Sequence, residues 1–315
     1  MWMPDLLNPV IFVVGPTASG KTNLSIQIAK ALDSEIISAD SRYFYRMMDI
    51  GTAKPDRKEM QNIKHHMIDI ADPDETISLA IFKQDVTKII DQMHQKRKVP
   101  IIVGGTGQYV HAVLHNWEMP AAEADYRLRD YLEAFAENHG KLKLYEFLEK
   151  VDPDAAKIID YRNLRRTIRA IEVMLKTGHR FSIQRRKEST IYSHKTIGIR
   201  WDRSILYQRI DERIEKMIET GLIDEIKKLQ NLGYSSALPS MSAIGYKEIS
   251  KYIQGEISLD EAIVLIKRNS RTYVRRQANW FKADDPNIRW FDGDELDIQQ
   301  IIDFLKSEEE WIKPK

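Results

Sequence analysis

The chain has 315 residues and no Cys, and its 48 Lys and Arg side chains nearly balance 47 Asp and Glu side chains. With 43% hydrophobic residues it has the composition of a folded globular protein, and the lack of Cys excludes disulfide frameworks, thiolate metal sites and cysteine nucleophiles. No apolar stretch approaches the roughly 20 residues of a membrane-spanning helix, so we expect a cytoplasmic protein with no membrane partner.

The first elements form a phosphate-binding motif. Residues 10–14 (VIFVV) are a continuous apolar run, typical of a strand buried on both faces of a parallel sheet. The next eight residues, GPTASGKT, match G-x-x-x-x-G-K-[ST] and precede a segment with helical spacing, 23–32. Backbone N–H groups and the positive end of the helix would bind phosphate oxygens, and the Thr22 hydroxyl would ligate Mg²⁺. The predicted phosphate-binding residues are Gly15, Pro16, Thr17, Ala18, Ser19, Gly20, Lys21 and Thr22.

Three further strands are predicted, at 36–40 (IISAD), 99–107 (VPIIVGGTG) and 196–201 (TIGIRW). Helical stretches such as 79–96 separate them. This alternation predicts an α/β, P-loop NTPase-like fold, a three-layer sandwich with a parallel sheet.

The pattern changes in the middle of the chain, where helical segments such as 126–135 and 164–175 follow one another without a convincing strand. We interpret this stretch as a helical insertion in the α/β core. A second helical region, 203–282, has Gly221 and Gly233 as candidate helix ends. The predicted parts are 1–116 (core, first part), 117–193 (insertion) and 194–315 (core, second part).

Positive charge is concentrated in two segments. Residues 157–200 contain 12 basic and 3 acidic side chains, and 267–282 contain six basic and none acidic. Clustered positive charge favours a polyanionic partner such as RNA, although a solvated face is the simpler alternative. Helical spacing places one basic ridge on the insertion and another near the C-terminus, made of Arg162, Arg165, Arg166 and Arg169, and of Lys267, Arg268, Arg271, Arg275 and Arg276.

The residues themselves leave the reaction open. Asp40 ends the second strand, where ligands of open α/β sheets collect, and could accept a proton or simply cap a turn. His65, His66 and Asp69 could ligate a metal or be structural. No Asn-Lys-x-Asp guanine motif occurs, and the third strand lacks the acid that a motor ATPase often carries. A small-molecule or nucleoside kinase and a non-catalytic nucleotide- and RNA-binding protein both remain possible.

A set of motifs, in order along nearly the whole chain, resembles the tRNA dimethylallyltransferase (tRNA isopentenyltransferase) family. These motifs are GPTASGKT (15–22), ISADS (37–41), MDIGTAKP (48–55), HHMID (65–69), GGTG (104–107), AIGYK (243–247) and RQANWF (276–281). The sequence departs from the family pattern at 42–44, where RYF replaces the usual MQV, and at Gln108, which replaces an aliphatic residue.

The resemblance implies a prenyltransferase reaction. The family transfers the dimethylallyl group of dimethylallyl diphosphate to N6 of the adenine at position 37 of tRNA, releasing diphosphate. By this resemblance the phosphate loop would bind the diphosphate with Mg²⁺, and Asp40 would accept the proton of the attacking amine. Thr106 would lie beside the substrate channel and Arg213 would contact the diphosphate. The partners would be the tRNA anticodon stem-loop and dimethylallyl diphosphate, and we expect a monomer.

The resemblance also assigns tRNA contacts to four segments and to two further residues. The residues are Asp40, Ser41, Arg42, Tyr43, Thr106, Arg127, Arg165, Arg166, Thr167, Ile168, Arg169, Ser242, Ala243, Ile244, Gly245, Tyr246, Lys247, Arg275, Arg276, Gln277, Ala278, Asn279, Trp280, Phe281 and Lys282.

Overall fold

The computed structural model describes residues 8–118, 125–184 and 191–307. The chain forms two compact units, which we call the core unit (1–114 and 190–315) and the helical unit (115–189). The predicted insertion, 117–193, extends past this boundary at its C-terminal side, because strand β5 of the core unit already begins at Ser193.

The core unit is built on a six-stranded sheet in which every pair of neighbouring strands is parallel. The strand order is β3-β2-β4-β1-β5-β6. The parallel α/β architecture predicted from the sequence is confirmed, whereas the two edge strands, β3 and β6, were not predicted. The strands are β1 (Pro9–Val14), β2 (Ile36–Ser38), β3 (His65–His66), β4 (Ile101–Gly104), β5 (Ser193–Arg200) and β6 (Ile288–Asp292).

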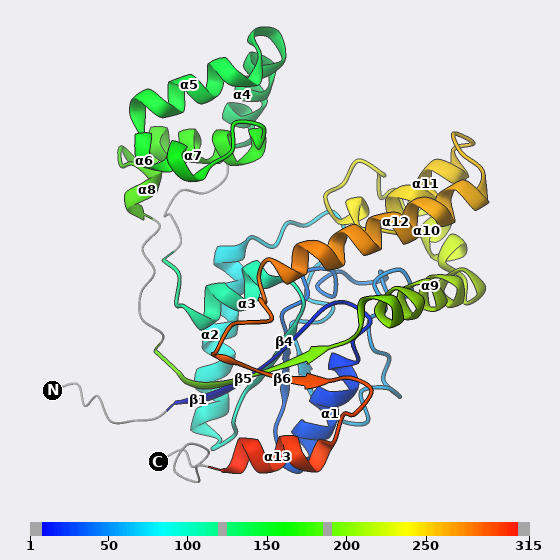
Figure 1. Ribbon diagram of the computed structural model, residues 1–315. Coiled ribbons are helices and arrows are strands. Elements are labelled where there is room, and N and C mark those ends of the chain that lie inside the picture. Colours follow the sequence, from blue (N-terminus) through cyan, green and yellow to red (C-terminus); the bar gives the residue numbers. More distant parts are fainter. Residues whose placement is uncertain (1–7, 119–124, 185–190, 308–315) are drawn as a thin grey trace, which may run out of the picture. The chain divides into compact units, whose positions relative to one another are not determined.

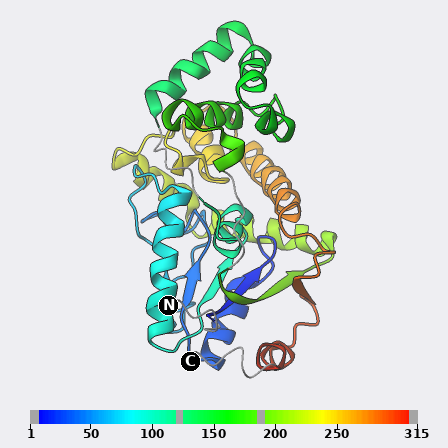
Figure 2. The same ribbon diagram turned by 90° about the vertical axis from the view of Figure 1, so that its left-hand side faces the viewer.

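Helices cover both faces of the sheet. Because side chains alternate along a strand, Ile11 and Val13 of β1 pack on one helical layer and Phe12 and Val14 pack on the other. Figures 1 and 2 show the two layers, with α2 (cyan) and α13 (red) on opposite faces. The first layer consists of α1 (Lys21–Ala31) and α13 (Ile298–Lys306), and the second of α2 (Leu79–Gln95) and α3 (Gly107–Leu114).

A group of helices follows β5 and packs through a third apolar cluster. The predicted helix ends are confirmed: α9 ends at Glu219 and α10 at Asn231, and Gly221 and Gly233 adopt φ angles of 103° and 93°. A capping box in which Ser258 and Glu261 bond reciprocally starts α12. The group comprises α9 (Arg203–Glu219), α10 (Leu222–Asn231), the 3₁₀ helix η1 (Ser240–Ser242), α11 (Tyr246–Ile253) and α12 (Leu259–Ala278).

The helical unit has an apolar core of its own. Glu172 of α7 is fully buried there, and its carboxylate lies 2.9 Å from Arg129 Nη2 and 2.6 Å from Arg169 Nη1. Its helices are α4 (Tyr126–His139), α5 (Lys141–Val151), α6 (Pro153–Ile158), α7 (Leu164–Thr177) and α8 (Phe181–Gln184). Across both units, none of the described helices has the length and apolar character needed to span a bilayer.

Candidate active site

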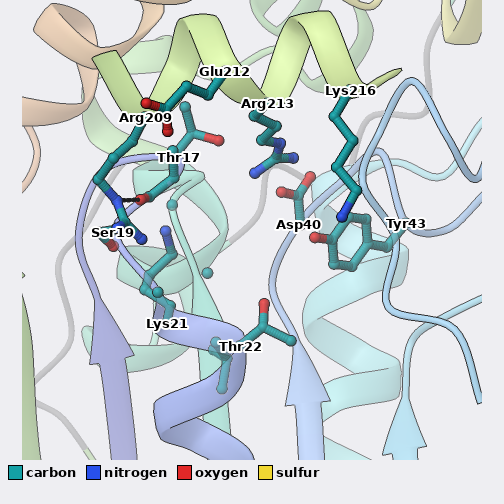
Figure 3. Close-up of a pocket in the computed structure, with 15 residues that line it drawn as sticks. Thr17, Ser19, Lys21, Thr22, Asp40, Tyr43, Arg209, Glu212, Arg213 and Lys216 are labelled. Carbon is teal, nitrogen blue, oxygen red and sulfur yellow. Dashed lines mark hydrogen bonds between the residues drawn. The ribbon is translucent and has the colours of Figure 1, made fainter. Parts of the chain in front are cut away.

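Three neighbouring strands, β2, β4 and β1, bring the predicted site residues to one edge of the sheet. Asp40 follows β2, Gly105 and Thr106 follow β4, and the phosphate loop, 15–22, follows β1. Because the strands are parallel, their carboxyl ends lie side by side, and this edge is where ligands bind in open α/β sheets. We call these three segments the floor of the site (Figure 3).

The phosphate loop has the backbone geometry that its glycines allow. Gly15 adopts φ 142°, and a Cβ at this position would lie 2.7 Å from the carbonyl oxygen of Ile199 in β5. Gly20 adopts φ 95° as the N-cap of α1 and has no side chain with which to cap the helix. The first N–H groups of α1 are therefore directed toward the cavity, which is the arrangement that binds anions.

The loop also carries polar groups suited to an anionic ligand. Burial lowers the pKa of Lys21 to about 8, while the Asp40 carboxylate opposes this shift and the Arg213 guanidinium adds to it. The Ser19 side chain is 2% exposed, and its hydroxyl has no hydrogen-bond partner among the described residues. A phosphate oxygen would both satisfy this hydroxyl and favour the charged form of Lys21.

A cavity of about 430 Å³ lies above the floor, and α9 covers it. Three basic residues of α9, Arg209, Arg213 and Lys216, line the cavity on one face of the helix and form what we call the roof (Figure 3). Together with Lys21 they surround the space with positive charge, whereas Asp40 and Glu212 contribute the carboxylates. Such a cavity is suited to a polyanionic ligand with a proton acceptor at its side.

Asp40 occupies the side of the cavity next to Tyr43. Its Oδ1 accepts a hydrogen bond of 3.0 Å from the backbone N–H of Arg42, so the carboxylate both stabilises the turn and faces the cavity. The Tyr43 hydroxyl donates to the carbonyl of Ala53 at 2.8 Å. Burial, reinforced by the nearby Asp40 carboxylate, raises the pKa of Tyr43, which therefore remains a neutral donor.

The phosphate loop is held from outside by side chains that are distant in sequence. Trp201 Nε1 donates to the carbonyl of Ser19 at 3.0 Å, and Arg209 Nε donates to the carbonyl of Ala18 at 2.9 Å. The Arg209 guanidinium lies 4.4 Å from the centre of the Trp201 ring. From α12, Gln277 Oε1 accepts the N–H of Thr17 at 2.9 Å. The shape of the loop therefore depends on α9 and α12 as well as on its own glycines.

The roof is in turn supported by the segment that follows Asp40. Arg213 Nη2 donates to the carbonyl of Thr52 at 3.1 Å. The Glu225 carboxylate accepts the N–H groups of residues 49, 50 and 51 and also the hydroxyl of Tyr246. The buried Lys54 pairs with the carboxylates of residues 49 and 69 at 2.7 and 2.6 Å. The MDIGTAKP and AIGYK motifs therefore build the support of Arg213.

The structure separates the predicted tRNA-contact residues into exposed and buried groups. The exposed ones are Arg127, Arg165, Arg166, Ser242, Lys247, Arg275, Arg276, Ala278, Asn279 and Lys282. Partly exposed are Asp40, Ser41, Arg42, Tyr43, Thr106, Arg169, Ile244 and Trp280. The buried ones are Thr167, Ile168, Ala243, Gly245, Tyr246, Gln277 and Phe281, so their side chains are not open to RNA in this structure and their assignment to tRNA binding stays a prediction.

Tyr246 is an example of the buried group, because the ring is completely buried and the hydroxyl is bonded to Glu225. Ile168 likewise faces the core of the helical unit, as expected for the apolar side of α7. In the C-terminal basic ridge, Lys267 pairs with Glu215 at 2.6 Å and Arg271 pairs with Asp211. These two ion pairs join α12 to α9. We therefore expect RNA contact on this ridge to be made by its exposed residues, such as Arg275 and Arg276.

The structure also decides between the alternatives for the HHMID segment. His66 Nε2 lies 2.7 Å from Glu35 Oε2, His65 Nδ1 lies 2.9 Å from the carbonyl of Ile63, and Asp69 pairs with Lys54. The described residues contain no group of three or more His, Asp or Glu side chains able to hold a metal ion. The structural interpretation of these histidines therefore applies.

Several residues of the cavity were missed by the sequence analysis. Arg209 and Lys216 flank Arg213 at intervals of four and three residues, so helical spacing could have revealed them. The Tyr273 hydroxyl lies 3.5 Å from Thr106 Oγ1, and neither this contact nor the bond from Thr17 to Gln277 has a local sequence signal.

Comparisons with known proteins match the chain to one enzyme family. A family model described as "IPP transferase" matches residues 43–284. The "tRNA dimethylallyltransferase" of Bacillus pumilus is 47% identical over 292 residues, covering 92% of this chain and 91% of the relative.

Two solved structures extend the comparison to the fold. The crystal structure of a full-length "tRNA isopentenylpyrophosphate transferase" from Bacillus halodurans aligns with a TM-score of 0.72 at 42% identity, covering 97% of this chain and 98% of that one. A structure described as a "eukaryotic dimethylallyltransferase acting on tRNA" aligns with a TM-score of 0.82 at 26% identity, covering 95% of this chain and 80% of that one.

Proposed function

This chain belongs to the IPP transferase family and catalyses dimethylallyl transfer to tRNA, and we propose that the acceptor is N6 of the adenine at position 37, beside the anticodon. The donor is dimethylallyl diphosphate, and the products are N6-dimethylallyladenosine and diphosphate. We expect the enzyme to act as a monomer in the cytoplasm, where its tRNA substrate is found. The observation that carries the proposal is the convergence of the phosphate loop, Asp40 and Arg213 on one cavity.

Charge on the leaving group explains the basic lining of the cavity. As the allylic C–O bond breaks, negative charge grows on the diphosphate oxygen, and preorganised cations and N–H groups stabilise it. Lys21 and the loop amides approach from the floor, and Arg213 approaches from the roof. Because Arg213 is also bonded to the Thr52 carbonyl, its guanidinium is positioned before the substrate arrives.

We assign to Asp40 the removal of the acceptor's proton. An exocyclic adenine amine is a weak nucleophile, and it must lose a proton as its bond to the allylic carbon forms. The Asp40 carboxylate lines the same cavity as the phosphate loop, so it can accept that proton beside the departing diphosphate. Thr106 follows the cavity-lining Gly105 directly, and we assign it to the channel through which the substrates meet.

The floor also suits Mg²⁺. Thr22 lies at the start of α1 and lines the cavity, and its hydroxyl is an oxygen ligand of the kind that Mg²⁺ prefers. We propose that Thr22 holds the ion together with diphosphate oxygens. When bound, Mg²⁺ would neutralise charge on the leaving group.

The test is direct. Unmodified tRNA is incubated with dimethylallyl diphosphate, Mg²⁺ and either the wild-type protein or the Asp40→Asn variant, and the nucleosides are analysed by mass spectrometry. The wild type should form N6-dimethylallyladenosine. In Asp40→Asn the amide oxygen can still accept the Arg42 N–H but cannot accept a proton, so the transfer rate at saturating tRNA should fall by about 10²–10⁴-fold.

Two results would contradict the proposal. Rapid phosphoryl transfer from ATP without RNA would favour the kinase alternative. A wild-type protein that binds tRNA but forms no product with any tRNA would favour the non-catalytic alternative.

A further inference from the structure

The carboxamide of Gln277 joins two loops that the reaction uses. Its Oε1 accepts the N–H of Thr17 in the phosphate loop, and its Nε2 donates to the carbonyl of Gly105, each at 2.9 Å. The side chain is only 4% exposed, and the Gly105 carbonyl belongs to the turn that carries Thr106. One side chain of α12 therefore bridges the phosphate loop and the turn that carries Thr106.

The close approach of α12 to this turn requires glycine. A Cβ at Gly105 would lie 2.3 Å from Gln277 Nε2, and a Cβ at Gly107 would lie 2.1 Å from the Trp280 ring. Tyr273, one turn before Gln277, places its hydroxyl 3.5 Å from Thr106 Oγ1. Tyr273, Gln277 and Trp280 are spaced by four and three positions, so they lie on one face of α12 and of the residues just after it. This face packs against the GGTG turn.

Only a side chain that both donates and accepts can form this bridge. A carboxamide offers an acceptor oxygen and an N–H donor at the same distance from the backbone, whereas an ionised Glu has no donor and Met has no strong hydrogen-bonding group. Gln277 also lines a second cavity of about 270 Å³, together with Gly15 and Pro16. Its side chain thus lies between that space and the Thr17 and Gly105 backbone that lines the cavity of the reaction.

We propose that Gln277 is a positioning residue for the transfer reaction, fixing the distance between the bound diphosphate and the turn that carries Thr106. The inference rests on the proposed function, since it assigns to that reaction a residue that touches neither substrate. A shift of about 1 Å between reacting groups can cost about 10²-fold in rate, so two backbone hydrogen bonds are sufficient to matter.

The experiment compares wild type with Gln277→Met and Gln277→Glu in single-turnover transfer at saturating tRNA and dimethylallyl diphosphate. Gln277→Met keeps the volume but loses both hydrogen bonds, and its rate should fall about 10- to 100-fold while the tRNA dissociation constant stays within about two-fold of wild type. Ala262→Gly is the matched control: it weakens the same helix at a buried position in the cluster of α9–α12. This control should lower the melting temperature without lowering the transfer rate.

The Gln277→Glu variant adds a pH test that a purely structural role would not affect. A protonated carboxyl has the same donor and acceptor pattern as a carboxamide, and burial beside a diphosphate site favours the protonated form. The rate of this variant, divided by the wild-type rate, should therefore rise as the pH falls from about 8 toward 5.5. A ratio that does not change with pH contradicts the proposal, as does a Gln277→Met rate equal to that of wild type.

Binding of inorganic pyrophosphate with Mg²⁺, measured by calorimetry, separates this inference from the proposed function. If Gln277 positions the loop, Gln277→Met should weaken pyrophosphate binding by about 10-fold, and Ala262→Gly should not. If the wild type makes no dimethylallyl product, the proposed function is wrong, and the pyrophosphate measurement still decides whether Gln277 shapes the loop. Equal affinity in wild type and Gln277→Met would overturn the positioning role.

Discussion

The floor and the roof of the cavity are built in different ways. The floor consists of short loops at the ends of adjacent strands, and its phosphate loop is a single contiguous motif. The roof consists of side chains spaced along α9, about 190 residues from the loop that Arg209 bonds. The strands therefore bring the floor segments together, with Trp201, Arg209 and Gln277 holding the loops in shape, whereas the roof residues come from one helix and bond to backbone carbonyls of distant loops.

This difference indicates a division of labour. The backbone N–H groups of the phosphate loop and of the start of α1 form an anion site of the kind that P-loop proteins share. The arginines of the roof lie outside the phosphate-loop motif, so we expect them to adapt this common anion site to the transfer of an allylic group.

The largest effect in the roof is expected at Arg213. Arg213→Gln removes a cation facing the diphosphate, and kcat/KM for dimethylallyl diphosphate should fall about 10²–10³-fold, comparable with the loss of an oxyanion donor. Arg213→Lys keeps the charge but not the planar fork that also bonds the Thr52 carbonyl, so its activity should lie between those of Gln and wild type.

Steady-state kinetics with varied dimethylallyl diphosphate measures both variants of Arg213. If the kcat/KM of Arg213→Gln stays within about threefold of the wild-type value, the floor alone stabilises the leaving group. The roof would then have no role in catalysis.

The contrast between floor and roof also explains how far the sequence could be interpreted. A buried strand, a glycine loop and a helix are local patterns, so the phosphate loop and the parallel sheet were predicted and the fold is confirmed. The edge strand β3 was missed because it contains only two residues, both half-buried histidines. An edge strand this short gives no hydrophobic period to detect.

Residues of the roof and its supports were harder to predict. Tyr246 and Gln277 were assigned to RNA contact because their motifs resemble a family of RNA-modifying enzymes, yet both side chains are buried. A motif match does not tell whether a side chain contacts a ligand or packs against a neighbouring loop of the same protein. That Glu225 binds three backbone amides and Tyr246 depends on the packing of α10 and α11, which has no local pattern.

The helical unit should show a smaller and different effect, on binding rather than on chemistry. Arg165 and Arg166 are exposed on α7, whereas the neighbouring Arg169 is paired with the buried Glu172. If the first two contact tRNA phosphates, Arg165→Gln with Arg166→Gln should weaken tRNA binding and reduce the slope of log K against log salt by about 1 to 2, with kcat at saturating tRNA unchanged.

Filter binding at several salt concentrations measures this slope. Lys157→Gln is the control within the same unit, since the exposed Lys157 pairs locally with Asp154 at 2.8 Å and its loss should leave the slope unchanged. An unchanged slope in the Arg165 and Arg166 double variant would show that this face of α7 does not bind the RNA backbone.

The smallest effect is expected from three partly buried histidines of the sheet, two on the edge strand β3 and one, His194, at the end of β5 opposite the cavity. Burial lowers the pKa of His65, His66 and His194, so each favours its neutral form in the folded protein. As the pH falls through about 6.5, the unfolded chain takes up these protons before the folded chain does, and stability is lost. Above that pH the contribution is fully present. The melting temperature should therefore decrease between pH 7.5 and 5.5.

His194→Asn removes one of these groups and should make the melting temperature depend less steeply on pH, while kcat at pH 7.5 stays at the wild-type value. The Asn side chain can replace the contact between His194 Nδ1 and the Tyr192 carbonyl, which is 3.4 Å in the wild type, so packing should change little. If the melting temperatures of the two proteins depend equally steeply on pH, His194 does not contribute to the loss of stability in acid. A lowered kcat would show instead that the far end of the sheet influences the phosphate loop and the other segments of the floor.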